Sequence, residues 1–236
     1  MNDTGFILIH GAGLGSFIWD DLKNKLALPS VSVDFPNRNA DEQTNAGLHF
    51  RDYVDSIIKQ IEKSDIGRFI IVAHSIGGCV GLKVADHFKE RLAGFIGISA
   101  AIPLNGGSFI STLTFPQNLI MPLMLRFAGT KPPEHAIVNG MCHDVSAVKK
   151  EMVIKRFTPE SPFLFTEKCG APVPETRRYF IKLDLDKEFS PSLQDKMAIN
   201  LSAQKVSYLH SGHLPMLSQP DKLAITLNNF AKEIIK

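Results

Sequence analysis

Residues 69–81 read Phe-Ile-Ile-Val-Ala-His-Ser-Ile-Gly-Gly-Cys-Val-Gly, and this stretch decides the fold. Its first four residues are apolar and mostly β-branched, which is typical of a buried strand. The glycines that follow, mixed with apolar residues, indicate the first turns of a closely packed helix. Ser75 stands on the turn between the two, in a small-x-Ser-x-Gly pattern that resembles a nucleophile elbow, with Ala73 in place of the first glycine. The alternative is an ordinary tight strand-to-helix turn that contains a serine.

Strands and helices are expected to alternate on both sides of this turn. Strands are predicted over 5–10, 31–35, 69–73, 92–98, 178–183 and 205–209, and helices over 16–28 (with Ser16 as N-cap), 47–64, from the elbow to about 91, 191–201 and 219–235. Such alternation predicts an α/β fold with a mostly parallel six-stranded sheet and helices on both faces.

The segment 101–175 interrupts this alternation. It holds most of the prolines and no clear strand, although 141–157 has helical periodicity. Because the alternation resumes afterwards, we expect a helical cap inserted into one domain that spans residues 1–236.

Composition excludes several classes of function. The 236 residues carry a formal net charge of +2, with basic residues scattered, which gives no reason to expect nucleic acid or a membrane as partner. Cys79, Cys142 and Cys169 are far apart and have no metal-binding spacing, so we expect reduced thiols and neither a metal nor an organic cofactor. No basic N-terminal stretch and no apolar run of about 20 residues is present, which predicts a soluble, cytoplasmic protein without a signal peptide.

The first predicted strand runs into Gly11-Ala12-Gly13-Leu14-Gly15. This turn begins like a dinucleotide fingerprint, but the third glycine is misplaced and Asp34 lies at the wrong spacing for the ribose. Glycines after a strand also let backbone N–H groups point into a site, which is the interpretation we favour.

Three groups with complementary chemistry follow predicted strands. Ser75, Asp186 and His213 occur in the chain order nucleophile, acid, base, and ligands of open α/β sheets bind at the carboxyl ends of strands. A serine hydroxyl needs a base to take its proton, and a carboxylate on the other imidazole nitrogen orients that base. On the residues alone, Asp184 competes with Asp186, and His210 with His213.

Four motifs resemble those of a known family. They are His10-Gly-Ala, Ala-His-Ser-Ile-Gly-Gly at 73–78, Asp-Leu-Asp-Lys-Glu-Phe-Ser-Pro-Ser-Leu-Gln at 184–194 and Ser-Gly-His-Leu-Pro at 211–215. Together they resemble the α/β-hydrolase superfamily, and within it the six-stranded group of plant methylesterases, hydroxynitrile lyases and bacterial carboxylesterase relatives.

The resemblance implies roles for individual residues. It assigns His213 as the base, in a Gly-His-x-Pro loop, and Asp186 as the acid, because Pro191 follows it at the family spacing. Ser75 would be the nucleophile. The resemblance also implies an oxyanion hole built from the backbone N–H groups of Ala12 and Ile76.

The implied function is that of a carboxylesterase-type serine hydrolase. It would cleave a small or medium apolar ester through an acyl-enzyme, with no cofactor. Gly11 and Leu214 stand where hydroxynitrile lyases of this group carry threonine and lysine, which makes lyase chemistry less favoured. A thioesterase, a lactonase, or a ligand-binding protein on a hydrolase scaffold remain the alternatives.

Overall fold

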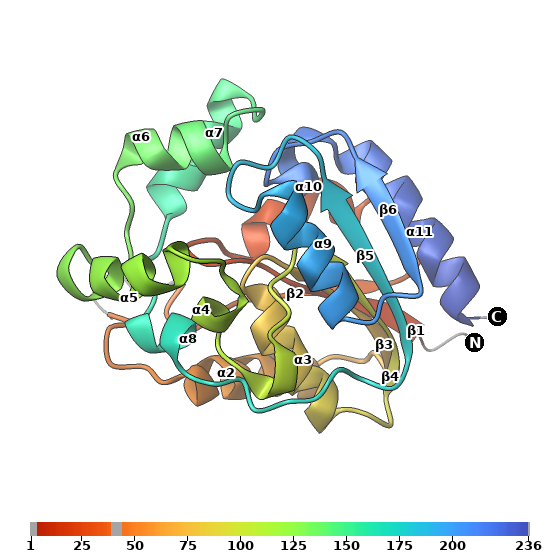
Figure 1. The fold of residues 1–236 in the computed structure, drawn as a ribbon. Helices are drawn as coiled ribbons and strands as arrows, with labels where there is room; N and C mark the ends of the chain where they lie inside the picture. The colour runs from red at the N-terminus through yellow and green to blue at the C-terminus, as the bar shows by residue number, and fades with distance from the viewer. Residues whose placement is uncertain (1–3, 39–43, 236) are drawn as a thin grey trace.

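The computed structural model describes residues 4–38 and 44–235 and is built on a six-stranded sheet (Figure 1). The strands are β1 (Thr4–Ile9), β2 (Ser30–Val33), β3 (Arg68–His74), β4 (Leu92–Ile98), β5 (Arg177–Leu183) and β6 (Lys205–Leu209). Their order across the sheet is β2-β1-β3-β4-β5-β6, and every neighbouring pair is parallel. The predicted six-stranded α/β architecture is therefore confirmed.

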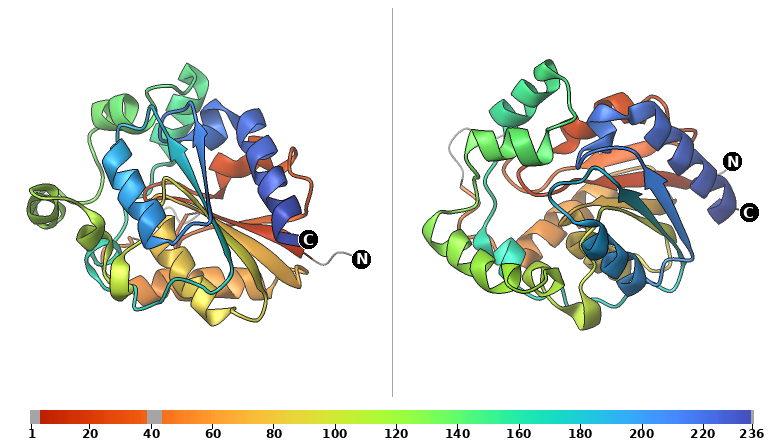
Figure 2. Two further views of the ribbon diagram at one scale, coloured as in Figure 1. Left: turned by 45° about the vertical axis from the view of Figure 1, so that its right-hand side comes forward. Right: turned by 45° about the horizontal axis from the view of Figure 1, so that its top comes forward.

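Helices cover both faces of this sheet, as Figures 1 and 2 show. The helices outside the insertion are α1 (Asp20–Lys23), α2 (Phe50–Glu62), α3 (Gly77–His87), α9 (Pro191–Asn200), α10 (Pro215–Ser218) and α11 (Pro220–Ile235). Side chains of β1 alternate between the two layers. Ile7 and Ile9 join a buried cluster under α2, α3 and α9, whereas Phe6 and Leu8 join one under α1 and α11. The strands read as continuous apolar runs because both faces are buried.

The insertion is helical, as predicted, and no strand occurs within 101–175, all of which the structure describes. Its helices are α4 (Phe109–Thr112), α5 (Gln117–Phe127), α6 (Glu134–Ala136), α7 (Ala147–Arg156) and α8 (Pro162–Thr166), with a 3-10 turn at Leu104–Gly106 and a π-helical turn at Ile137–Met141. The helix predicted over 141–157 is shorter than expected because the turn at 142–146 interrupts the periodicity. Figure 1 shows α4–α8 gathered at the end of the molecule opposite both termini.

The helix predicted over 16–28 was wrong in length and in its cap. The chain forms a 3-10 turn at Ser16–Trp19 and then only the single turn of α1. Gly15 occupies the N-cap position. The backbone N–H and the hydroxyl of Ser16 both donate to the Asp34 carboxylate at the end of β2, at 2.6 and 2.7 Å, which ties the turn to β2 instead.

Close backbone contacts explain the glycines after Ser75. A Cβ on Gly77 would lie 2.5 Å from the His10 carbonyl oxygen, and a Cβ on Gly78 would lie 2.5 Å from that of Ala101. Both distances are too short for any other residue, because backbone oxygens cannot move aside as a flexible side chain does. The first turn of α3 therefore packs directly on the chain that leaves β1 and β4.

The prediction that no signal peptide is present concerns the N-terminus, of which residues 1–3 lie outside the described residues. Among those described, no helix is both long and apolar enough to cross a membrane.

Gly78→Ala is expected to lower the free energy of unfolding by about 1–3 kcal/mol, because the added methyl overpacks a backbone contact. Equilibrium urea unfolding measures this change. Gly47 is the matched control, since a Cβ there meets nothing within 4 Å and Gly47→Ala should leave stability unchanged or slightly raised. Equal stability of the two variants would contradict the close packing of α3.

Candidate active site

The site lies where the order of the strands changes direction, because β2 is added on one side of β1 and β3 on the other. β1 lies between β2 and β3, and its residue Ile9 pairs in register with Ala73 of β3. The glycine turn after β1 and Ser75 after β3 therefore emerge side by side at the carboxyl edge, where open α/β sheets bind ligands. A Cβ on Gly11 would lie 2.9 Å from the Cβ of Ser75, so the turn passes directly against that serine.

A cavity of about 420 Å³ opens at this point. Gly11, Ala12, Ser75, Ile76 and His213 line its floor. Much of the remaining wall is apolar and comes from the cap, through Phe109, Met121, Leu125, Met141, Phe157 and Phe165. The structure thus places the predicted nucleophile, base and oxyanion residues around one apolar cavity.

Ser75 is held in a conformation that non-glycine residues rarely adopt. Its φ is +54°, in the left-handed region. Its N–H donates to the Ile98 carbonyl at 3.3 Å, and its carbonyl accepts from the N–H groups of Gly78 (3.0 Å) and Ala101 (2.8 Å). Strained backbone of this kind persists only where the surroundings impose it, and it clusters at functional sites.

His213 and Asp186 form a buried pair. His213 Nδ1 lies 2.8 Å from Asp186 Oδ2, and the same oxygen accepts from the Ser99 hydroxyl at 2.7 Å. The other oxygen accepts from the N–H groups of Glu188 and Phe189 at 2.8 and 3.1 Å. Burial raises the pKa of Asp186, but the charge of His213 and these hydrogen bonds outweigh it and hold the pKa at about 2. The carboxylate is therefore ionised at neutral pH.

The contact with Asp186 also sets the pKa of the His213 imidazole. Burial lowers the pKa of His213, but the carboxylate of Asp186, with smaller effects from Glu188 and Asp144, raises it above the ordinary value. Because Asp186 accepts a hydrogen bond, Nδ1 carries a proton, and Nε2 of a neutral ring is left as the basic nitrogen. His213 lines the cavity together with Ser75.

Asp184 and His210, the two competing residues, lie outside this arrangement. His210 Nδ1 lies 2.9 Å from Asp184 Oδ2, with 71% and 47% of the two side chains exposed. They form a surface pair, and neither lines the cavity. Solvent screening leaves such a pair little influence on the site.

His10 and His74 are fully buried and do not line the cavity. His10 Nδ1 donates to the Gly11 carbonyl (2.7 Å), while Nε2 accepts from the Phe35 N–H (3.1 Å). His74 Nε2 donates to the His213 carbonyl at 2.8 Å. Burial lowers the pKa of His10 well below its usual value and that of His74 to about 3, so both rings are neutral supports for the loops they contact.

Ala12 and Ile76 each offer a free backbone donor. Both residues line the cavity, and within the described part of the chain neither N–H donates a hydrogen bond. Two unoccupied N–H groups beside Ser75 are the arrangement that stabilises a developing oxyanion.

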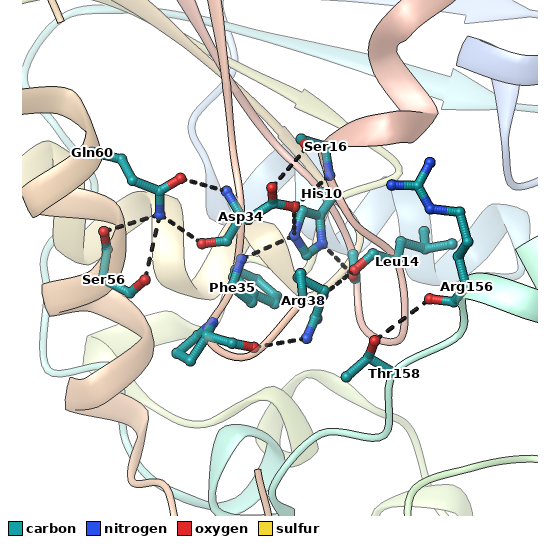
Figure 3. Close-up of polar contacts among 12 residues, drawn as sticks. His10, Leu14, Ser16, Asp34, Phe35, Arg38, Ser56, Gln60, Arg156 and Thr158 are labelled. Atoms are coloured by element: carbon teal, nitrogen blue, oxygen red, sulfur yellow. Dashed lines mark hydrogen bonds and ion pairs between the residues drawn. The ribbon is translucent and has the colours of Figure 1, made fainter. Parts of the chain in front are cut away.

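A buried ion pair that sequence reasoning missed fastens the glycine turn. The Glu160 carboxylate accepts from the Gly13 N–H at 2.9 Å and pairs with Arg38, with only 1% and 5% of the two side chains exposed. Arg38 Nε also donates to the Leu14 carbonyl at 2.5 Å, as Figure 3 shows. The N–H of Thr158 donates to the Gly13 carbonyl at 3.0 Å. The turn that bears Ala12 is thus tied to the C-terminal part of the cap.

A second cap carboxylate, also missed, holds the histidine loop. Asp144 Oδ2 accepts from the Gly212 N–H at 2.6 Å and from the Ser211 hydroxyl at 3.3 Å. No local sequence pattern predicts such contacts, because Asp144 and Gly212 lie 68 residues apart, and Glu160 and Gly13 lie 147 residues apart. In the sequence, Asp144 and Glu160 appear only as two acidic residues of the cap.

The three cysteines are buried and form no disulfide. Among the described residues, no group of three or more His, Cys, Asp or Glu side chains is arranged to hold a metal ion.

Comparison with known proteins agrees with this architecture. A model of the alpha/beta hydrolase family matches residues 6–226. The chain is 25% identical to putative methylesterase 14, chloroplastic, of Arabidopsis thaliana, over 92% of this chain and 69% of that protein, and 24% identical to polyneuridine aldehyde esterase of Rauvolfia serpentina, over 91% and 90%. An extracellular alpha/beta-hydrolase from a Paenibacillus species superimposes with a TM-score of 0.83 at 19% identity, over 96% and 98% of the two chains. The chain belongs to the α/β hydrolase family.

Proposed function

We propose that this protein is a serine esterase that cleaves carboxylic esters of small or medium apolar substrates through an acyl-enzyme. One observation carries the proposal, namely that His213, which is held by a buried hydrogen bond to Asp186, lines the same cavity as Ser75. The esterase names of the related proteins and the apolar cavity wall support the choice of ester as substrate.

In the proposed mechanism, Ser75 Oγ attacks the ester carbonyl while His213 Nε2 takes the hydroxyl proton. The N–H groups of Ala12 and Ile76 bind the oxyanion of the tetrahedral intermediate. His213 then gives its proton to the leaving alcohol, and the acyl group stays on Ser75. Water, activated by the same imidazole, attacks the acyl-enzyme and releases the acid. Asp186 stabilises the imidazolium that forms in each half of the reaction.

The setting of this reaction is part of the proposal. Three buried, unpaired cysteines suit a reducing compartment such as the cytoplasm. The substrate that we propose is a small molecule, because Ser75 lines a cavity of about 420 Å³.

Ser75→Ala should lower kcat for p-nitrophenyl butyrate by at least about 10⁴-fold, because no other group replaces the nucleophile. It should also abolish labelling by a fluorophosphonate probe. Ser202→Ala is the matched control, since Ser202 also has a positive φ, of +49°, but is exposed and remote from the cavity. Equal turnover by Ser75→Ala and wild type would refute the mechanism.

Asp186→Asn should lower kcat by roughly 10⁴-fold and move the acid limb of the pH profile. In the wild type, kcat/KM falls as the pH drops through the pKa of His213, which the carboxylate holds above about 6.5. Without that carboxylate the imidazole protonates only at lower pH, so the limb shifts toward acid. Asp184→Asn removes a carboxylate that contacts the exposed His210 and should change neither quantity. A shift caused by Asp184→Asn instead would reverse the assignment of the acid.

Glu160→Gln should reduce both stability and turnover. It leaves the Arg38 charge buried without its partner, which costs about 3–5 kcal/mol of unfolding free energy. If the turn that bears Ala12 shifts by about 1 Å, kcat falls by up to about 10²-fold in the molecules that remain folded. Glu151→Gln, which breaks an exposed ion pair with Lys155 in α7, is the control and should be near neutral. Reduced stability with unchanged kcat would limit Glu160 to a structural role.

A further inference from the structure

The outer surface of α5 is apolar and exposed. We call it the α5 face, and it consists of Phe115, Leu119, Ile120, Leu123, Met124 and Phe127, each between 49% and 80% exposed. The i, i+4, i+8 spacing of Leu119, Leu123 and Phe127 places these three in one row. Isolated apolar residues are ordinary on a surface, but a contiguous group of this size marks an interaction site. Figures 1 and 2 show α5 at the outer edge of the cap, away from both termini.

The inner surface of the same helix lines the cavity. Met121 and Leu125 belong to the cavity wall, and Met124 belongs both to that wall and to the α5 face. The exposed residues Gly129 and Lys131 line the cavity as well, so its mouth opens beside the α5 face. A helix that is apolar on both sides is normally buried, which means that the outer side of α5 calls for a covering partner.

The charged residues of the segment that carries this surface are of one sign. Residues 92–133 contain no aspartate or glutamate, and their only cations are Arg126 and Lys131. Both cations are exposed, and the Arg126 guanidinium lies 5.7 Å from the centre of the Phe127 ring. The next carboxylate along the chain is Glu134, in α6. Cations beside exposed apolar side chains characterise helices that lie on anionic lipid surfaces.

We propose that the α5 face docks on a lipid surface with anionic headgroups, and that an ester dissolved in that surface enters the cavity past Met124. The route to the cavity rests on the proposed function, whereas the docking does not. No membrane partner was expected from the net charge and from the absence of a long apolar run. Neither property describes a helix that lies on a membrane surface. The proposal needs no spanning helix.

A second copy of the chain fits this surface less well. In an isologous dimer, Arg126 and Lys131 of one copy would face the same cations of the other. No carboxylate between 92 and 133 is present to neutralise them. Lipid phosphates supply the missing negative charge, and acyl chains accommodate an irregular row of leucine, isoleucine and phenylalanine side chains.

Vesicle flotation tests the docking directly, with vesicles of phosphatidylcholine alone and of phosphatidylcholine mixed with phosphatidylglycerol. Wild type should float with the mixed vesicles and bind pure phosphatidylcholine more weakly, by about fivefold for each of the two cations. Arg126→Gln should lose about fivefold on the mixed vesicles only. Leu119→Glu/Phe127→Glu should lose at least about tenfold on both, because each apolar side chain is replaced by an anion.

The control is Ile225→Glu on α11, which removes a side chain of similar exposure (61%) on the opposite side of the sheet from α2 and α3 and should leave flotation unchanged. Leu119 and Phe127 do not line the cavity, so their double variant should still hydrolyse a dissolved ester at the wild-type rate. For an ester embedded in the mixed vesicles, the double variant should be slower than wild type, because it no longer docks on them.

The proposal is overturned if wild type does not float, or if Leu119→Glu/Phe127→Glu floats as well as Ile225→Glu. It is also overturned if light scattering finds a wild-type dimer that the double variant dissociates, since a second copy then covers the α5 face. Wild type that floats but hydrolyses no dissolved ester would sustain the docking and refute the proposed function. Wild type that hydrolyses a dissolved ester but does not float would refute the docking alone.

Discussion

The contact between the first turn of α3 and the chain leaving β1 and β4 constrains everything else in the site. Gly77 and Gly78 bring that turn close to the backbone carbonyls of His10 and Ala101, where a Cβ would lie 2.5 Å from each oxygen. Ser75, two residues before Gly77, has a left-handed φ and lines the cavity together with Gly11. The strain at one residue is small compared with the packing that enforces it. The position of Ser75 is thus set by the sheet and the helix that it joins.

Three carboxylates position the loops of the site: Asp186 and Glu160 are buried, and Asp144 is partly buried. Asp186 holds the imidazole of His213, Asp144 holds the N–H of Gly212, and Glu160 holds the N–H of Gly13. Each acts through hydrogen bonds that are stronger because the acceptor is charged. The cap contributes two of these three residues, so it is part of the framework of the site as well as the wall of the cavity.

The sequence was informative where a local pattern has a physical cause. Apolar runs located β1 and β3 because strands covered on both faces tolerate few polar residues, and the glycines after Ser75 reported a backbone contact. The choice between Asp184 and Asp186 depended on family resemblance, because both precede the same helix and only the fold shows which one reaches His213. The N-cap of the first helix was wrong because Asp34, 18 residues away, accepts hydrogen bonds from the N–H and the hydroxyl of Ser16. Glu160 could not be found for the same reason, since its partners are brought to it only by folding.

The cap has two parts that differ in what a substitution there would disturb. Asp144 and Glu160 flank α7 and hold the loops of the site, and Met141 and Phe157 in the same part also line the cavity. α4 and α5 contribute side chains to the cavity wall alone. Substitutions in α4 and α5 can therefore reshape the substrate pocket while the positions of the histidine loop and the glycine turn are preserved. The shape of the cavity can therefore change through that half of the insertion, while the half around α7 keeps the histidine loop and the glycine turn in place.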